Sequence, residues 1–272
     1  EYDHLGFLLA RTHAETSRLP AFMHDAAKVR YIAMASDLQP HVMVIAPTGS
    51  GKGVGFVIPN LLQSSCSSVV LDVKGENYEK TSRLRHDAGY KIIRFAPTDY
   101  GVESSSYNPL VRISKIEDRG EQMLEVEMLA TLFLKTSNDK NESLLSGGRQ
   151  VFVACTMLAF EQGQPNLGHV YDLVNSGGTD LVDRYKGYAD TTDNPRLRIE
   201  FEAIAANDPE SLANMVSIMN NAGLAPWKHE RVRSLTKTTD FEFSDLRSKR
   251  PVRPRSVSFQ PSSPTASPDP AA

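Results

Sequence analysis

The chain has 272 residues, of which 40% are hydrophobic and 23% charged, with a formal net charge of −3 at pH 7. Such a chain is long enough to bury a large core, and its slight negative charge excludes a uniformly basic surface for nucleic acid or anionic lipid. The two cysteines, Cys66 and Cys155, are far apart, which excludes a disulfide scaffold and fits a reducing compartment. No uninterrupted apolar run reaches the roughly 18 residues needed to cross a bilayer.

The first part of the chain alternates between strand and helix patterns. Short apolar runs predict buried strands at residues 42–46, 68–73 and 90–95. Helical patterns lie between them, at residues 53–62 and 75–88, and Gly89 is placed to end the second helix. This order predicts right-handed crossovers and a mostly parallel sheet of the α/β class.

From about residue 117 the apolar residues recur at helical spacing, which predicts helices at residues 121–135, 149–161, 197–206 and 209–221. The last of these has Asp208 at the N-cap position, Pro209 at the first helical position and Gly223 just beyond its end. Polar loops separate the helices. We therefore expect a small helical bundle inserted into the sheet domain.

The composition changes again at Pro251, because residues 251–272 contain six prolines interleaved with serines and almost no large apolar residues. Such a segment cannot bury enough surface to offset the entropy lost on ordering. This composition predicts a disordered tail.

The strongest chemical signal lies between the first predicted strand and the first predicted helix. It reads Ala46-Pro47-Thr48-Gly49-Ser50-Gly51-Lys52-Gly53. Gly49 and Gly51 let backbone N–H groups turn toward an anion, Lys52 can reach terminal phosphates, and the helix directs its positive dipole end at them. The pattern predicts a site for a nucleoside triphosphate. The alternative is a glycine-rich turn with an exposed lysine.

Two positions depart from the usual phosphate-loop pattern. The first glycine is replaced by Ala46, and the Ser or Thr that offers a hydroxyl to magnesium is replaced by Gly53. Any Mg²⁺ must therefore be held by other groups.

The candidate metal-binding group is an acid at the end of the second predicted strand. Asp72 stands in the run Leu71-Asp72-Val73-Lys74-Gly75-Glu76, where a parallel sheet brings it near the phosphate loop. Its carboxylate can orient Mg²⁺ or a metal-bound water. Alternatively, Asp72 is the N-cap of the next helix, and Lys74 and Glu76 are solvated charges of the first turn.

A motor ATPase also needs a later buried strand ending in Asp-Glu, in which the Asp holds magnesium through water and the Glu is the general base. The sequence has no such pair after an apolar run. Acidic pairs such as Glu117-Asp118 lie in polar stretches typical of a protein surface.

Over residues 41–250 these motifs resemble those of the VirD4/TraG family of type IV secretion coupling proteins. The resemblance rests on the phosphate loop, on Asp72-Val73-Lys74-Gly75-Glu76, on Phe95-Ala96-Pro97 followed by Ser106-Tyr107-Asn108-Pro109-Leu110, and on Phe241 with Asp245-Leu246-Arg247. Gly53 in place of the hydroxyl residue is common in this family.

The resemblance implies a RecA-like P-loop NTPase fold with a parallel sheet and an inserted all-α domain. In the family the Asp-Glu strand comes after the Asp245-Leu246-Arg247 motif, so we expect a truncated chain with an incomplete sheet and little or no ATP hydrolysis. The expected parts are a lead-in at residues 1–40, a nucleotide-binding part at 41–115, the all-α domain at 116–226, a return segment at 227–250 and the disordered tail at 251–272.

The resemblance also implies ATP and Mg²⁺ as cofactors, with Asp72 on the metal. The residues expected to bind the nucleotide are Thr48, Gly49, Ser50, Gly51, Lys52, Gly53, Asp72 and Lys74. Family members are anchored hexamers on the cytoplasmic face of the bacterial inner membrane, and they deliver relaxase-bound single-stranded DNA or effector proteins to the type IV secretion channel. Without the anchor, this chain is expected to be soluble by itself.

Two other functions stay open. A non-enzymatic module would bind secretion substrates through the all-α domain without turnover, and nucleotide binding distinguishes the two hypotheses. A P-loop kinase or a DNA-translocating motor of cell division is a third possibility, which a large helical insertion after Asn108-Pro109 fits less well.

Overall fold

The computed structural model describes residues 5–12, 30–35, 41–64, 66–137, 141–177, 180–247 and 255–259. The chain divides into two compact units. The sheet unit comprises Glu1–Asp99 and Glu242–Ala272, and the helical unit comprises Tyr100–Phe241. The helical unit is thus longer at both ends than the all-α domain expected at residues 116–226.

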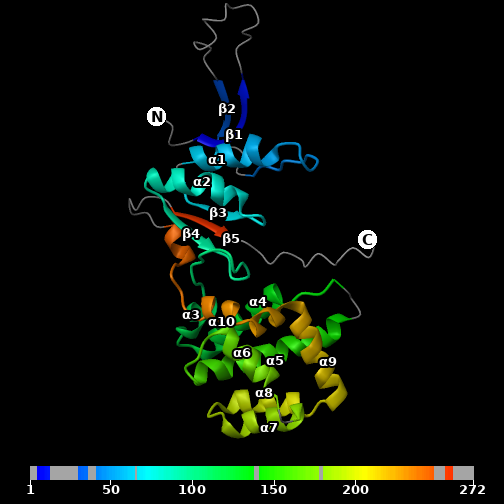
Figure 1. Cartoon of the computed structure of the whole chain (residues 1–272). Helices are drawn as coiled ribbons and strands as arrows, with labels where there is room; N and C mark the ends of the chain where they lie inside the picture. The colour runs from blue at the N-terminus through cyan, green and yellow to red at the C-terminus, as the bar shows by residue number, and fades with distance from the viewer. Residues whose placement is uncertain are drawn as a thin grey trace, which may run out of the picture. The chain divides into compact units, whose positions relative to one another are not determined.

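Three parallel strands form the larger of the two described sheets of the sheet unit (Figure 1). In spatial order they are β3 (Ser68–Leu71), β5 (Arg255–Phe259) and β4 (Lys91–Phe95). Helix α2 (Glu76–Asp87) connects β3 to β4 and contacts β4. The two strands predicted at residues 68–73 and 90–95 are therefore present, with somewhat shorter bounds.

The middle strand of this sheet falls in the segment whose composition predicts disorder. That prediction is wrong for Arg255–Phe259, where every residue is in register with β4 and four are in register with β3. The run lies between Pro254 and Pro261 and contains no proline, so each residue keeps the N–H that a ladder needs. Residues 251–254 and 260–272 lie outside the described residues.

An antiparallel pair of strands belongs to the lead-in. β1 (Leu5–Thr12) pairs with β2 (Arg30–Ala35), and β1 also contacts the helix α1 described below. The other residues of the lead-in lie outside the described ones.

The strand predicted at residues 42–46 is not formed. The segment is unpaired, and Met43 and Ile45 are 85% and 84% exposed. A short apolar run predicts burial, but a strand also needs an edge with which to pair. In the described sheet, β3 and β4 pair with β5 instead.

Helix α2 ends at the glycine that the sequence predicts. Gly89 has a φ of 92°. The N–H groups of Gly89 and Tyr90 donate to the carbonyl oxygens of His86 and Arg85, at 2.7 and 2.9 Å. This pair of bonds is a Schellman motif, which favours glycine because its central residue has a positive φ.

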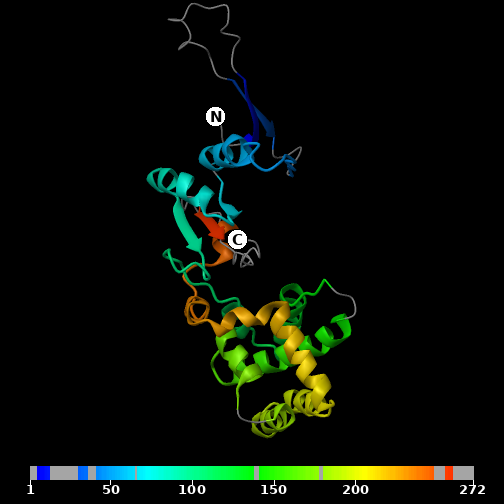
Figure 2. The ribbon, with the colours of Figure 1, turned by 45° about the vertical axis from the view of Figure 1, so that its right-hand side comes forward.

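The helical unit contains four helices at the predicted places and others that the spacing does not reveal. The four are α4 (Arg119–Phe133), α5 (Glu142–Glu161), α8 (Pro195–Ala205) and α9 (Pro209–Met219). The others are α3 (Leu110–Ser114), α6 (Leu167–Asn175), α7 (Leu181–Thr191) and α10 (Glu230–Leu235). Helices α3, α6 and α10 are short, and α6 and α7 contain glycine, which weakens a helical pattern. Figure 2 shows α7 and α8 side by side, in agreement with the contacts between these two helices.

Helix α5 is the centre of the helical unit. It has 11 buried residues and contacts α4, α6, α8 and α9. Within the described residues it is the one helix long and apolar enough to cross a membrane by length and composition, and 61% of that apolar window is buried inside the protein. A core position accounts for this composition.

The two cysteines, Cys66 and Cys155, are both free. Burial raises the pKa of the Cys155 thiol, whereas Cys66 is exposed.

Helix α9 begins as predicted and ends differently. The Asp208 side chain accepts from the Ser211 N–H at 3.0 Å, with Pro209 at the first helical position. The chain then continues through a π-helical turn, in which Gly223 has a φ of 173°, outside the left-handed region. Gly223 instead allows a close approach, because an added Cβ would lie 3.1 Å from the Phe133 carbonyl oxygen.

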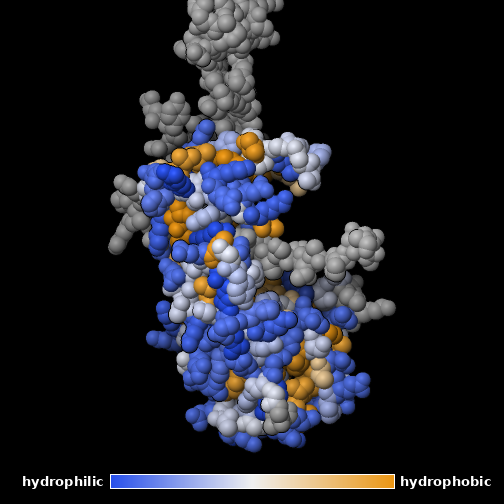
Figure 3. All heavy atoms as spheres, in the orientation of Figure 1, coloured by the Kyte–Doolittle hydropathy of each residue, from blue (hydrophilic) through white to orange (hydrophobic). Residues whose placement is uncertain are grey.

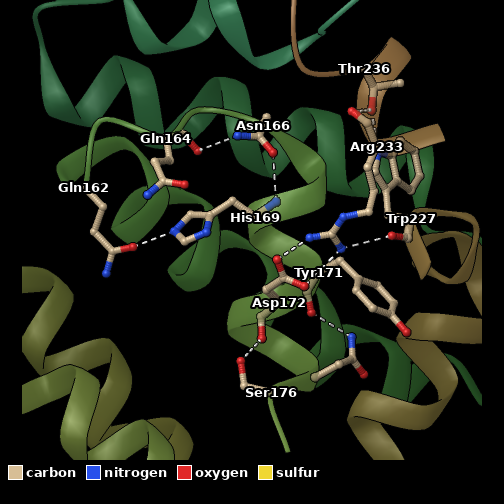
Figure 4. Close-up of polar contacts among 11 residues, drawn as sticks. Gln162, Gln164, Asn166, His169, Tyr171, Asp172, Ser176, Trp227, Arg233 and Thr236 are labelled. Atoms are coloured by element: carbon tan, nitrogen blue, oxygen red, sulfur yellow. Dashed lines mark hydrogen bonds and ion pairs between the residues drawn. The ribbon is translucent and has the colours of Figure 1, made fainter. Parts of the chain in front are cut away.

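An ion pair joins α6 to α10. Arg233 donates to both carboxylate oxygens of Asp172, at 3.0 Å for Nη1, and to the Trp227 carbonyl oxygen at 3.2 Å (Figure 4). On α6, His169 Nε2 lies 2.6 Å from Oε1 of Gln162, the residue that follows α5. Desolvation lowers the pKa of His169. The ion pair between Arg233 and Asp172 therefore fixes α10 on α6.

The two ends of the helical unit pair with each other. We call segments 100–108 and 235–241 together the neck. Ser106 and Asp240 exchange two hydrogen bonds there. The Ser106 N–H donates to the Asp240 carboxylate at 2.7 Å, and the Asp240 N–H donates to the Ser106 carbonyl oxygen at 3.0 Å.

Further contacts lie on both sides of this pair. The Tyr107 N–H donates to the Leu235 carbonyl oxygen at 2.9 Å, and the rings of Tyr107 and Phe241 stack with centroids 5.2 Å apart. Arg231 of α10 contacts segment 100–108 and donates to the Val102 carbonyl oxygen at 2.6 Å. Hydrogen bonds and ring stacking therefore join the two segments along the length of the neck.

Asn108 is the residue of the neck with the most partners among those described here. Its side-chain amide donates to the carbonyl oxygens of Pro165 at 2.7 Å and Lys237 at 3.1 Å. Its side-chain oxygen accepts from the Leu110 N–H at 2.9 Å and so starts α3. Asn108 is 3% exposed, so these bonds satisfy a buried amide.

Helices α5 and α9 approach closely at Gly148, where an added Cβ would lie 2.8 Å from the Met215 carbonyl oxygen. A backbone oxygen cannot swing aside as a side chain can. We therefore expect Gly148→Ala to lower the free energy of unfolding of the helical unit by about 1–3 kcal/mol. Urea unfolding followed by the fluorescence of Trp227, the only tryptophan and part of this unit, measures the change.

Gly187→Ala in α7 is the matched control. An added Cβ there has nothing within 4 Å, and alanine favours a helix over glycine by about 1 kcal/mol. The control is expected to be as stable as the parent or more so. A Gly148→Ala protein as stable as Gly187→Ala would contradict the close approach of α5 and α9.

Candidate functional site

The loop at residues 46–53 forms a turn with open space beside its glycines. Gly49 and Gly51 have φ angles of 79° and 84°, a conformation that other residues rarely adopt. An added Cβ at either glycine has nothing within 4 Å. Ser50 closes the turn by donating to the Pro47 carbonyl oxygen, from its N–H at 3.3 Å and from its hydroxyl at 2.7 Å.

Lys52 stands at the start of the helix that follows, and its side chain folds back over the loop. Its ammonium group donates to the carbonyl oxygens of Ala46 and Pro47, the second at 2.8 Å. The residue is half-buried. The loop therefore presents a fixed positive charge together with the free N–H groups of a helix start, which is the combination that binds phosphate.

The helix predicted at residues 53–62 is present in two parts. Gly53–Val57 forms a π-helical turn, and α1 spans Ile58–Gln63. The Ile58 N–H donates to the carbonyl oxygen of Gly53, five residues earlier. Pro59 explains this wider turn, because it lacks an N–H and its ring clashes with a carbonyl group four residues before it.

A buried arginine of α2 holds the other end of α1. Arg85 is 3% exposed and donates to the carbonyl oxygens of Leu61, Ser64 and Cys66, the last two at 3.1 and 3.2 Å. Its guanidinium carbon lies 4.0 Å from the centroid of the Tyr90 ring. A cation at a helix C-terminus satisfies the last carbonyl groups and favours the helix dipole. Arg85 thereby fixes α1 on α2.

Asp72 follows β3 and is 3% exposed. Its carboxylate accepts from the Tyr78 N–H at 2.9 Å and from the Asn77 side chain at 3.3 Å. Both donors belong to the first turn of α2, where the helix dipole favours a negative charge. Asp72 therefore satisfies an N–H group of this turn, although the N-cap residue of α2 is Gly75 and not Asp72.

The other predicted site residues lie at the surface. Thr48, Gly49, Ser50 and Gly51 are exposed, as is Lys74, while Gly53 is partly buried. Among the hydrogen bonds of the described residues, none joins Asp72 or Lys74 to the loop. The structure thus brings Lys52 together with the loop carbonyls, and Asp72 together with α2.

The residues of the loop fit a phosphate group better than they fit a bare metal ion. The described part of the chain has no cluster of three or more His, Cys, Asp or Glu residues able to hold a metal. Magnesium at nucleotide sites needs few protein ligands, because it keeps several waters and binds the phosphates. Asp72 is the acid available for such a role by its position after β3.

A family model for conjugative DNA transfer by the type IV secretory system matches residues 13–252 of this chain. The chain belongs to that family. Its relatives include VirD4 of Rhizobium radiobacter, 35% identical over 215 residues, which cover 78% of this chain and 30% of VirD4. The conjugal transfer protein TraG of Escherichia coli is 39% identical over 107 residues, which cover 38% of this chain and 16% of TraG.

Solved structures of the coupling protein TrwB show the same fold. TrwB in complex with the non-hydrolysable ATP analogue ADPNP gives a TM-score of 0.59 at 17% identity, and the match covers 94% of this chain and 56% of that one. The unbound monoclinic form of TrwBdeltaN70 gives 0.57 at 17%, with 94% and 55% covered. The sheet unit therefore belongs to a RecA-like P-loop NTPase fold.

We expect Asp72→Asn to loosen the first turn of α2. The substitution keeps the size of the side chain but removes a charge that stabilises a helix N-terminus by about 0.3–1 kcal/mol, so hydrogen exchange of the Tyr78 N–H should accelerate about 2- to 5-fold. Exchange measured by NMR tests this. Glu79→Gln is the control, because Glu79 is in the same first turn but exposed. Unchanged exchange in Asp72→Asn would show that the charge of Asp72 does not stabilise the first turn of α2.

Proposed function

We propose that this chain is the nucleotide-binding part of a type IV secretion coupling protein and binds ATP with Mg²⁺. The observation that carries the proposal is the loop of Gly49 and Gly51, with Lys52 folded over it at the start of a helix. Membership of the conjugative DNA transfer family and the likeness to TrwB support it.

The proposed roles follow from the contacts of each side chain. Backbone N–H groups of the loop surround the phosphate oxygens, and Lys52 exchanges a carbonyl partner for a phosphate oxygen. Asp72 would hold Mg²⁺ directly or through water, while its carboxylate keeps the hydrogen bonds from Asn77 and Tyr78. The residues that we propose to line the site are Thr48, Gly49, Ser50, Gly51, Lys52, Gly53, Asp72 and Lys74.

We also propose that this polypeptide hydrolyses ATP slowly or not at all. Of the three described parallel strands, β3 is followed by Asp72, whereas β4 is followed by Ala96 and β5 by Gln260. None of these positions offers a Glu as general base for the attacking water. Nucleotide binding and turnover are therefore separable in this chain.

The wider role is proposed from the family, since the match covers about 30% of the length of the VirD4 relatives. The proposed partners are relaxase-bound single-stranded DNA or effector proteins and components of the secretion channel. The proposed assembly is a homo-hexamer at the cytoplasmic face of the bacterial inner membrane. In it the helical unit receives the substrates.

A second candidate is a module that binds secretion substrates without using nucleotide. It is favoured by the helical unit, which has its own hydrophobic core and closes on itself through the neck. A titration with nucleotide separates the two candidates.

We expect Lys52→Ala to bind a fluorescent ATP analogue about 10- to 100-fold more weakly than the parent, because a charge-assisted hydrogen bond worth about 1.5–3 kcal/mol is lost. Fluorescence titration in the presence of Mg²⁺ measures the dissociation constant. Lys80→Ala is the control, because Lys80 is an exposed lysine of α2. If parent and Lys52→Ala have equal affinity, the loop is not the nucleotide site and the second candidate is favoured.

ATP hydrolysis by the 272-residue chain should be slower than about 10⁻¹ s⁻¹, because absence of a general base lowers a typical rate of about 10 s⁻¹ by roughly 10²- to 10⁴-fold. Phosphate release at saturating ATP measures the rate. A rate of about 1 s⁻¹ or more that disappears in Lys52→Ala would mean that another residue activates the water.

A further inference from the structure

Helix α4 carries an exposed apolar line on the side away from the core. Leu124, Met128 and Leu132 are 55%, 54% and 68% exposed. They are spaced by four residues, so they lie along one side of the helix over about 12 Å. We call these three residues the α4 stripe.

The α4 stripe is not needed to attach the helix. The opposite side of α4 buries Gln122, Val126 and Ala130, and the helix contacts α3 and α5. Gln122 also donates to the Ile113 carbonyl oxygen at 3.2 Å. Single exposed apolar residues are ordinary, but a row of them on a helix that is already packed is typical of an interaction surface.

Acidic side chains stand on both sides of the α4 stripe. Glu121 and Glu127 are exposed. Glu125 is partly buried and accepts from Arg112 at 2.5 Å. Helical geometry places Glu127 and Glu125 on opposite flanks of the stripe, and Glu121 in line with it, about one turn before Leu124.

The charge of the whole helical unit has the same sign. Residues 100–241 contain 20 acidic and 14 basic residues, a formal net charge of −6, whereas the remainder of the chain carries +3. Figure 3 shows a largely hydrophilic face of this unit, on which hydrophobic residues form small separate patches. A negative unit repels the phosphates of nucleic acid and repels a second copy of itself, and it attracts a cationic partner.

We infer that the α4 stripe is the docking surface for an amphipathic helical segment of a partner protein, with apolar residues at four-residue spacing and basic residues on its flanks. This inference rests on the proposed function, in which the helical unit receives secretion substrates. It assigns the protein component of the substrate, not the DNA, to this surface. Apolar contact along the stripe provides affinity, and the flanking glutamates select basic partners.

The test uses the full chain and a synthetic amphipathic peptide of about 18 residues, with a leucine row and lysine flanks. A second peptide has the same leucines with glutamate flanks. Methyl resonances of Leu124, Met128 and Leu132 are followed by NMR during titration. We expect these signals to shift with the lysine peptide, and the affinity to fall as NaCl rises from about 50 to 300 mM.

The variant Met128→Gln with Leu132→Gln should bind the lysine peptide at least about 10-fold more weakly, because two of the three apolar contacts of the stripe are lost. Ile199→Gln is the matched control, since Ile199 is also an exposed apolar helical residue, 63% exposed on α8. We expect the control to bind within about 2-fold of the parent. Met128, Leu132 and Ile199 are all exposed, so we expect the variants to fold, and Trp227 fluorescence is the measurement that checks this.

Several results would overturn the inference. They are equal binding of the glutamate-flanked peptide, shifts confined to other methyl groups, shifts of the stripe caused by a single-stranded DNA oligonucleotide, and self-association in sedimentation that the double variant abolishes. Titration of the same samples with the fluorescent ATP analogue keeps the two proposals apart. Failure of peptide binding with normal nucleotide binding rejects the docking surface alone, and the reverse result rejects the nucleotide site alone.

Discussion

The arrangement of this chain depends on the neck, where two segments more than a hundred residues apart pair with each other. Asn108 makes this pairing specific, because its single amide satisfies carbonyl groups of Pro165 and Lys237 while its oxygen starts α3. A buried amide with these partners cannot be replaced by an apolar side chain without leaving polar groups unpaired. The neck therefore closes the helical unit on itself, and this unit has its own hydrophobic core.

The candidate nucleotide site relies on fewer and more local contacts. Glycines at positive φ give the loop its shape, and Lys52 is held against the loop carbonyl groups. Arg85 supports the same helix from its far end. Asp72, the acid that we propose for the metal, contacts the first turn of α2 and not the loop, so its charge also stabilises a helix. Charge at this position therefore affects stability as well as binding.

Local features of the site and fold could be predicted from the sequence, since they depend on neighbouring residues. The glycine loop, the Asp208 cap and the end of α2 at Gly89 are of this kind. Features set by distant partners could not. The apolar run at residues 42–46 has the pattern of a strand but pairs with no other strand. In contrast, β5 lies in a segment whose composition predicts disorder, yet it pairs with both β3 and β4. The contacts of Arg85 and Asn108 likewise join residues far apart in sequence and have no local signal.

The position of β5 has a consequence for how the chain folds. The middle strand of the sheet comes last in sequence, and about 160 residues separate Phe95 from Arg255, so the sheet must close a long loop. Once the neck has formed, the loop effectively shrinks to the stretches from Phe95 to Ser106 and from Asp240 to Arg255, about 26 residues together. Loop-closure entropy scales with the logarithm of length, so this shortening lowers its cost by about 1.5 kcal/mol. Formation of the neck before the sheet would thus bring β5 close to β3 and β4 at a lower entropic cost.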